Sequence, residues 1–180
     1  MEINTTNVTR NNISFQGNVS IVKKDSNGNV LKKTNINNTA VINLFKGLGY
    51  HLIGSSDLGS KVYPQYLGLG FIESGTPAIS TKPDQISLQS EYSTDRLRLD
   101  MSGLIINDDS SVSVRYSTTL YYTTLVGKSV NELGLFSTAS GDSLLARVYM
   151  VDDPISISLG ESVVVTWMIT IGNNSSEVKN

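Results

Sequence analysis

The sequence of 180 residues contains no cysteine, which excludes disulfide bridges and thiolate metal sites. Charged residues are also scarce: they make up 17 % of the chain, against roughly 25 % in an average globular domain. The net charge of -2 and the scattered lysines and arginines provide no basic surface for nucleic acid. No apolar run approaches the length of roughly 18 residues that indicates a membrane span. We therefore expect neither nucleic acid nor a membrane among the partners.

Catalytic groups are nearly as scarce. His51 is the single histidine, and it has no carboxylate within four residues on either side, so neither a catalytic triad nor a zinc site is indicated. The adjacent acids Asp108-Asp109 and Asp152-Asp153 lie in expected turns, and neighbours on an extended strand point to opposite faces. We expect no enzymatic activity, no catalytic residue, no cofactor and no metal. A glycoside-cleaving carboxylate pair is the enzymatic alternative.

The chain begins with a polar, Asn-rich stretch at residues 1–12, in which Ile3 and Val8 are the only large apolar side chains. Such a stretch cannot bury enough surface to order itself, so it predicts a flexible N-terminal arm that docks onto a neighbouring subunit. The polar opening residues also predict that no secretory signal is present.

A hairpin is expected next, because Ile13, Phe15, Val19 and Ile21 alternate with polar residues. The stretch Asp25-Ser26-Asn27-Gly28-Asn29 contains the Asn-Gly pair that favours a tight turn. The same stretch could be read as a calcium loop, but its glycine is misplaced and Ile36 stands where a bidentate Glu would be needed.

The rest of the chain predicts one amphipathic helix at 39–48 and then strands separated by turns. The expected strands are Val62–Ile72, Arg96–Ile106, Val112–Leu125, Val130–Phe136, Leu144–Val151 and Val163–Ile171, with a long irregular loop at Thr76–Tyr92. This spacing favours a mostly β fold, an antiparallel β-sandwich or open barrel with one short helix. We expect a single domain at 13–172, followed by a polar tail at 173–180.

Two charges are embedded in apolar strands, Glu132 and Arg147. An unpaired charge in such a place is costly, so we expect them to pair with each other or with Arg96 and Glu91. The alternation of apolar residues also predicts three core side chains, and these are Trp167, Phe136 and Leu133.

Eight tyrosines outnumber the other aromatic residues. Tyrosine combines an apolar ring with a polar tip, which suits protein interfaces and sugar-binding surfaces. Tyr121 and Tyr122 are the candidates for interface or glycan contacts, and half-buried strand positions are the alternative interpretation for each.

Five motifs resemble, in order, segments of small virion proteins of tailed bacteriophages. They are Tyr66-Leu67-Gly68-Leu69-Gly70-Phe71-Ile72, Leu88-Gln89-Ser90-Glu91 with Arg96, Asn131-Glu132-Leu133-Gly134-Leu135-Phe136, Leu144-Leu145-Ala146-Arg147-Val148, and Val163-Val164-Val165-Thr166-Trp167-Met168-Ile169. The resemblance covers residues 36–171. It departs where Leu69-Gly70-Phe71 replaces the Gly-Thr-Gly turn of that family.

The resemblance implies a structural subunit of a phage tail, from a fibre, collar or baseplate adaptor, that carries no catalytic residues. It implies assembly in the host cytoplasm, location in the virion, contacts with other virion proteins and a homo-oligomer. A capsid decoration or head-fibre protein and a module that binds host-surface glycans are the alternatives.

Overall fold

The computed structural model describes residues 12–40, 42–52, 63–77, 82, 84–92, 96–108, 111–125, 127–150 and 153–174. The expected arm at 1–12 lies outside the described residues except for Asn12, which begins a strand. The expected tail at 173–180 starts too early, because the last strand continues to Asn174. Within the described residues the protein is mostly β and its strands form two antiparallel sheets, which confirms the expected fold class.

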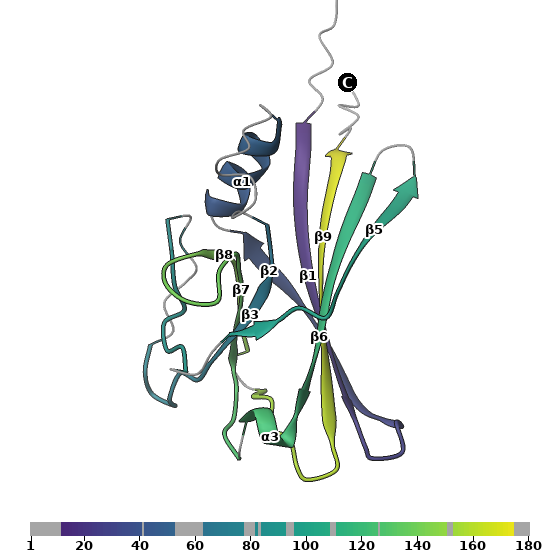
Figure 1. Ribbon diagram of the computed structural model, residues 1–180, viewed down its shortest axis with the longest axis vertical. Helices are drawn as coiled ribbons and strands as arrows, with labels where there is room; N and C mark the ends of the chain where they lie inside the picture. Colours follow the sequence, from purple (N-terminus) through teal and green to yellow (C-terminus); the bar gives the residue numbers. More distant parts are fainter. Residues whose placement is uncertain are drawn as a thin grey trace, which may run out of the picture.

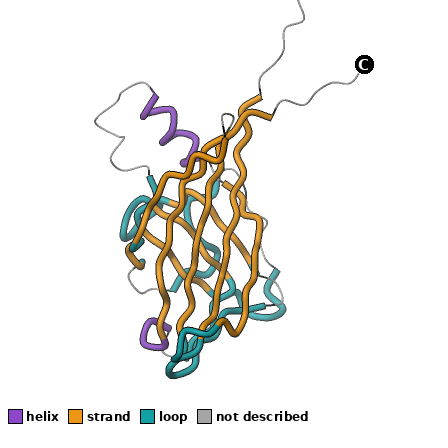
Figure 2. Tube along the Cα trace, turned by 90° about the vertical axis from the view of Figure 1, so that its right-hand side faces the viewer, coloured by secondary structure: helices purple, strands orange, loops and turns teal. Residues whose placement is uncertain are grey.

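Sheet A contains five long strands, seen from two directions in Figures 1 and 2. Their order across the sheet is β2 (Val30–Ala40), β1 (Asn12–Lys24), β9 (Ser162–Asn174), β6 (Ser111–Tyr121) and β5 (Met101–Asp108). Asn12 pairs with Asn174, so β1 begins and β9 ends at the end of the molecule that is uppermost in Figure 1. We call this the upper end, and the opposite end, which holds the β1–β2 turn, the lower end.

Sheet B is shorter and lies opposite sheet A (Figure 1). Its order is β4 (Leu97–Arg98), β3 (Tyr66–Gly70), β7 (Glu132–Phe136) and β8 (Leu144–Tyr149). Strand β2 joins the two sheets, because its residues Thr39 and Ala40 pair with Arg147 and Ala146 of β8. The nine described strands therefore follow one continuous order, which begins at β4 and ends at β5.

Two helices interrupt the strands of the described chain, where one was expected. Helix α1 spans Ile42–Leu52 rather than 39–48, because Thr39 and Ala40 continue strand β2. A short helix, α3 (Tyr122–Leu125), ends the strand that was expected to continue to residue 125.

The expected strand Arg96–Ile106 is two strands, β4 and β5, which belong to different sheets. The chain crosses between the sheets at Leu99 and Asp100. The N–H of Asp100 donates to the Ser117 carbonyl over 2.8 Å, and its carboxylate accepts from the Thr119 N–H over 3.2 Å. These bonds hold the crossing against β6.

The β1–β2 turn lies where the sequence predicted it, but Asn27 and Gly28 are not its two central residues, because the Gly28 N–H donates to the Asp25 carbonyl over 3.1 Å. Gly28 has a φ of 85°, which glycine adopts without steric cost. The Asp25 carboxylate accepts from the side chain of Asn29 over 2.9 Å and from the backbone N–H of Asn29 and Asn27 over 2.8 and 2.9 Å. The Asn29 side chain, with these backbone donors, holds the pKa of Asp25 below its ordinary value. The residues of the suggested calcium loop thus bond to one another.

The main core lies between the two sheets. Trp167 of β9 is 1 % exposed and lies opposite Val19 of β1, while Leu133 of β7 enters the same cluster from sheet B. Phe136 is also fully buried, but it belongs to a second cluster with Leu88 and Leu144. Leu133 and Phe136 are three residues apart on a strand and therefore face opposite sides of sheet B.

Sheet A is longer than sheet B, and this difference leaves part of sheet A uncovered. Strands β1 and β9 each have 13 residues, whereas β7 has 5 and β8 has 6. Helix α1 covers the upper end of β1: the rings of Phe15 and Phe45 meet edge to face with centroids 4.9 Å apart. The inner face of sheet A beyond β1 is not covered by this contact.

Candidate functional site

The four charged residues singled out in the sequence form two ion pairs. Arg147 Nε donates to Glu132 Oε1 over 2.6 Å, and both side chains are almost completely buried. Arg96 Nε and Nη2 donate to Glu91 Oε1 and Oε2 over 2.6 and 3.0 Å. Both pairs lie on the face of sheet B that is turned away from the main core, beside the second cluster.

Glu132 ties a loop to this face of sheet B. Its carboxylate accepts from the backbone N–H of Gln89 over 2.9 Å and from that of Ser90 over 3.0 Å, in addition to Arg147. These bonds fix the 84–92 segment, whose Leu88 is buried against Phe136. The three donors satisfy the hydrogen-bonding capacity of this buried carboxylate, so Glu132 serves as a fixed anchor for this segment.

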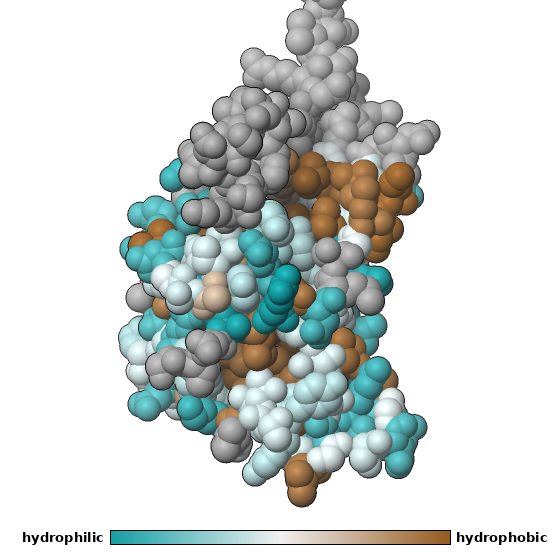
Figure 3. Space-filling model, viewed as in Figure 1, coloured by the Kyte–Doolittle hydropathy of each residue, from teal (hydrophilic) through white to brown (hydrophobic). Residues whose placement is uncertain are grey.

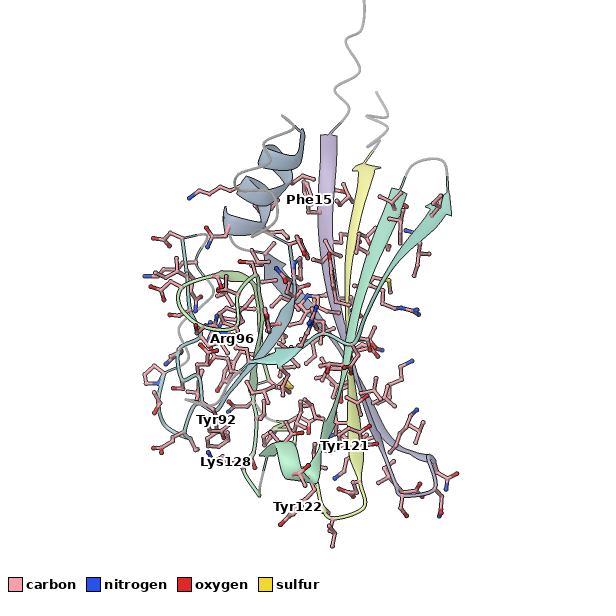
Figure 4. The ribbon with its side chains drawn as sticks, viewed as in Figure 1. Phe15, Tyr92, Arg96, Tyr121, Tyr122 and Lys128 are labelled. Carbon is pink, nitrogen blue, oxygen red and sulfur yellow. The ribbon has the colours of Figure 1, made fainter. Side chains whose placement is uncertain are left out.

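The C-terminal end of the 84–92 segment is held by further contacts of Tyr92, and Arg96 lies shortly after this segment (Figure 4). Tyr92 donates through its backbone N–H to the Leu69 carbonyl over 2.9 Å and through its hydroxyl to the Ser129 carbonyl. Lys128 Nζ lies 4.8 Å from the centre of the Tyr92 ring. Burial raises the pKa of Tyr92, which keeps its hydroxyl a donor at neutral pH. The guanidinium of Arg96 lies 3.4 Å from the centre of the Phe136 ring.

Three glycines make room for this segment against sheet B. A Cβ on Gly70 would lie 2.6 Å from the Ser90 carbonyl oxygen, and one on Gly68 would lie 2.4 Å from the Phe136 ring. A Cβ on Gly134 would lie 2.8 Å from both Leu88 and Leu144. The motifs Gly68-Leu69-Gly70 and Glu132-Leu133-Gly134 therefore serve close packing of the 84–92 segment against sheet B.

Candidate catalytic groups do not converge in the part of the chain that is described. Asp109, Asp152 and the side chains of Asp108 and His51 lie outside it, and Asp153 is bonded to Lys32 at the surface. The described residues contain no group of three or more His, Asp or Glu that could hold a metal ion. None of the described helices has the length and hydropathy needed to cross a bilayer.

The uncovered part of sheet A is apolar. Across the sheet, Ile106 of β5 lies opposite Val112, Val112 opposite Ile171, and Ile171 opposite Phe15. One row below, Leu104 lies opposite Val114, which lies opposite the core residue Ile169. Directly opposite residues share a face, so both rows continue the inner face. We call the residues Leu104, Ile106, Val112, Val114 and Ile171 the open face.

Exposure of the open face increases toward β5. Val112, Val114 and Ile171 are partly buried, whereas Leu104 and Ile106 are 68 % and 74 % exposed. Figure 3 shows this apolar area beside the upper end of the molecule. Ile105, on the outer face of the same strand, is 37 % exposed. The last strand of sheet A thus exposes three successive apolar side chains and a backbone edge with which no other described strand pairs, a feature typical of surfaces that bind another chain.

A groove at the lower end contains the two tyrosines that the sequence singled out (Figure 4). Tyr121 is 57 % exposed and Tyr122 37 %. The remaining lining comes from the β1–β2 turn, from helix α3, and from the loop before β9 with the first residue of that strand, and consists of Asp25, Ser26, Thr123, Leu159, Gly160, Glu161 and Ser162. Lys23, which bonds Glu161 over 2.7 Å, lowers the pKa of that carboxyl, so Glu161 is ionised at neutral pH and its charge is offset by the Lys23 ammonium.

Comparisons with known proteins add no relative: no family model, no curated protein and no solved structure matches this chain. The resemblance to phage virion proteins therefore stays a prediction from the motifs.

The two ion pairs and the two tyrosines of the groove were predictable from the sequence, whereas the exposed edge of sheet A was not predicted. The expected strand Arg96–Ile106 did not indicate which of its faces is covered or that its second half, β5, lies at an edge. The signal that could have revealed the edge was the run Leu104-Ile105-Ile106. Successive residues on a strand point to opposite faces, so such a run places apolar side chains on both faces, whereas a core on one side of the sheet covers only one of them.

Proposed function

We propose that this protein is a structural component of a tailed-bacteriophage virion, associated with the tail as part of a fibre, collar or baseplate adaptor. It acts by binding other virion proteins and further copies of itself. The order of the five motifs supports the phage assignment. Several of these motifs meet around the Glu132–Arg147 pair and the 84–92 segment, which is consistent with a resemblance in fold rather than in chemistry.

The observation that carries an assembly role is the open face beside the free edge of β5. Monomeric proteins seldom leave a contiguous apolar area next to an unpaired strand, because such an edge recruits other chains. The low content of charge fits the same role, since hydroxyl and amide groups are desolvated in an interface at lower cost than charges.

Fractionation of particles tests the proposal. Particles produced by the genome that encodes this chain are purified and separated into heads and tails, and each fraction is analysed by peptide mass spectrometry. We expect the chain in the tail fraction at a fixed ratio to the other tail proteins. Recovery with heads would replace the tail assignment by a decoration or head-fibre role. Absence from both fractions would overturn the virion assignment.

The lower groove favours a second function, binding of a host-surface glycan. Its two exposed tyrosine rings are groups that stack on sugar rings, whereas the carboxylates of Asp25 and Glu161 already accept from the β1–β2 turn and from Lys23. The groove lies at the opposite end from the open face, so glycan binding and assembly do not compete for one surface.

A glycan array, followed by titration of the best ligand, tests this second function. We expect Tyr121→Ala and Tyr122→Ala to weaken binding at least about tenfold, as for an aromatic residue at the centre of an interface. Tyr63→Ala is the matched control, because Tyr63 is 45 % exposed and does not line the groove. No binding on the array, or an equal loss in the control, would contradict the glycan role.

A further inference from the structure

Strand β5 is an edge whose apolar run lacks the usual protection against pairing, because the register shift of this strand comes after that run, between Ile106 and Asp108. The continuous order of described strands has two ends, and β4 at one end has only 2 residues. Strand β5 at the other end has 8 residues. Edge strands are commonly protected by lysine, by proline or by shortness. The sequence of β5, Met-Ser-Gly-Leu-Ile-Ile-Asn-Asp, contains no lysine, arginine or proline, and its one charge is the terminal Asp108.

We propose that two copies of this protein associate by antiparallel pairing of their β5 strands, which joins the two A sheets into one. The proposal rests on the assembly role proposed above and names its first partner, a second copy of the chain. A two-fold axis perpendicular to the sheet makes the contact closed and self-complementary.

The sequence of β5 is suited to pairing with itself. A two-fold axis perpendicular to the sheet requires one residue to lie opposite its own copy, and the middle of the apolar run is Ile105. Leu104 then lies opposite Ile106 of the second copy, on the inner face, and this pair occurs twice. Ile105 meets Ile105 on the outer face. Apolar side chains therefore meet on both faces of the new pair, where cross-strand contacts stabilise sheets.

Charge and sterics do not oppose this register. Asp108 follows the register shift of β5, so the one charged residue of the strand lies outside the paired apolar run of each copy. Gly103, which precedes the apolar run, adds no bulk. Leu104 and Ile106 of each copy lie next to the two-fold axis on the inner face. This register therefore also places the open faces of the two copies next to each other. The most exposed apolar residues of the open face are those that the pairing covers.

The size of the contact sets its expected strength. Pairing of strands of 8 residues buries less than the roughly 800 Å² per partner of a standard stable interface. We therefore expect a dimer that dissociates in the micromolar range in free solution. In a particle, where copies are held close together, the high effective concentration favours the same contact.

Sedimentation equilibrium of the full chain over a series of concentrations provides the first test. We expect a concentration-dependent dimer, and we expect Ile106→Lys to weaken association at least about tenfold, because the two-fold axis places two new ammonium groups near each other. Leu159→Lys is the control, since Leu159 is 85 % exposed at the lower end. Circular dichroism verifies that both variants are folded.

Cross-linking tests the register directly, because the chain has no cysteine of its own. Ile105→Cys should form a disulfide-linked dimer in a glutathione redox buffer, since each new thiol faces its own copy across the axis. Leu104→Cys is the matched control: its copy lies diagonally across the pair, beyond the roughly 7 Å between Cα atoms that a disulfide spans. Equal cross-linking of both variants, or of neither, would overturn the proposed register.

Two outcomes separate this inference from the proposed function. A dimer that persists in Ile106→Lys but is lost on deletion of residues 1–11 would overturn β5 pairing and place self-association in the expected arm. A monomer at every concentration, without cross-linking of Ile105→Cys, would also overturn β5 pairing. The particle fractionation described above is independent of both results and decides the virion role by itself.

Discussion

Glu132→Ala is expected to destabilise the protein by about 3–5 kcal/mol, the typical cost of removing one partner of a buried ion pair. The substitution leaves the Arg147 charge in a site where its side chain is 1 % exposed. It also removes the acceptor of the Gln89 and Ser90 N–H groups, which releases the 84–92 segment. Urea denaturation, followed by the fluorescence of the single tryptophan, Trp167, measures the loss.

The matched control is Asp153→Ala, which removes a carboxylate from an ion pair at the surface. Asp153 and Lys32 are 43 % and 53 % exposed, and such a pair contributes at most about 1 kcal/mol. The double variant Glu132→Leu with Arg147→Met removes both charges. We expect the double variant to be more stable than Glu132→Ala. It should remain less stable than the unchanged protein, because the N–H groups of Gln89 and Ser90 still lack their acceptor. A Glu132→Ala protein as stable as the Asp153→Ala protein would contradict the anchoring role.

Gly70→Ala is expected to destabilise the protein by about 1–3 kcal/mol, as overpacking in a well-packed site usually does. The new methyl group would lie 2.6 Å from the Ser90 carbonyl oxygen and 2.8 Å from Glu132 Oε2. The backbone at Ser90 cannot rotate away as a side chain can, so the 84–92 segment must move. Hydrogen exchange at the Gln89 and Ser90 amides should quicken, and urea denaturation gives the change in free energy.

Gly103→Ala is the control for this substitution. Gly103 also lies in a strand, but a Cβ there would have its nearest contact with Arg115 Nη2, at 3.9 Å. We expect the stability of this variant to be unchanged or raised by up to about 1 kcal/mol, because alanine restricts the unfolded chain more than glycine does. If both variants lose the same stability, the effect belongs to strand glycines in general and not to the fit of the 84–92 segment.

The sequence predicted elements that are defined by local patterns. Alternation along 13–21 and 163–171 indicated strands β1 and β9, and the Asn-Gly pair indicated the turn after β1. Boundaries that depend on tertiary contacts were wrong. Residues 39 and 40 were assigned to the helix because their pairing with β8 is not visible in a local pattern. The break at Asp100 was missed for the same reason.

The candidate site was predictable only in part. An isolated charge in an apolar strand demands a partner, which is why the Glu132–Arg147 pair could be expected. The additional bonds from Gln89 and Ser90 could not, because a loop interpreted as irregular gives no sign of where it docks. The role of Gly70 likewise depends on a neighbour 20 residues away in the sequence, Ser90.

The position of Asn12 beside Asn174 has a mechanical consequence. Backbone hydrogen bonds between antiparallel strands run perpendicular to the strands. A force that pulls these two ends apart would open the β1–β9 ladder like a zipper, one bond after another. A force applied between the upper end and the lower groove runs parallel to the strands and loads many bonds together in shear. We therefore expect the protein to resist a force between its upper and lower ends far better than a force that separates Asn12 from Asn174.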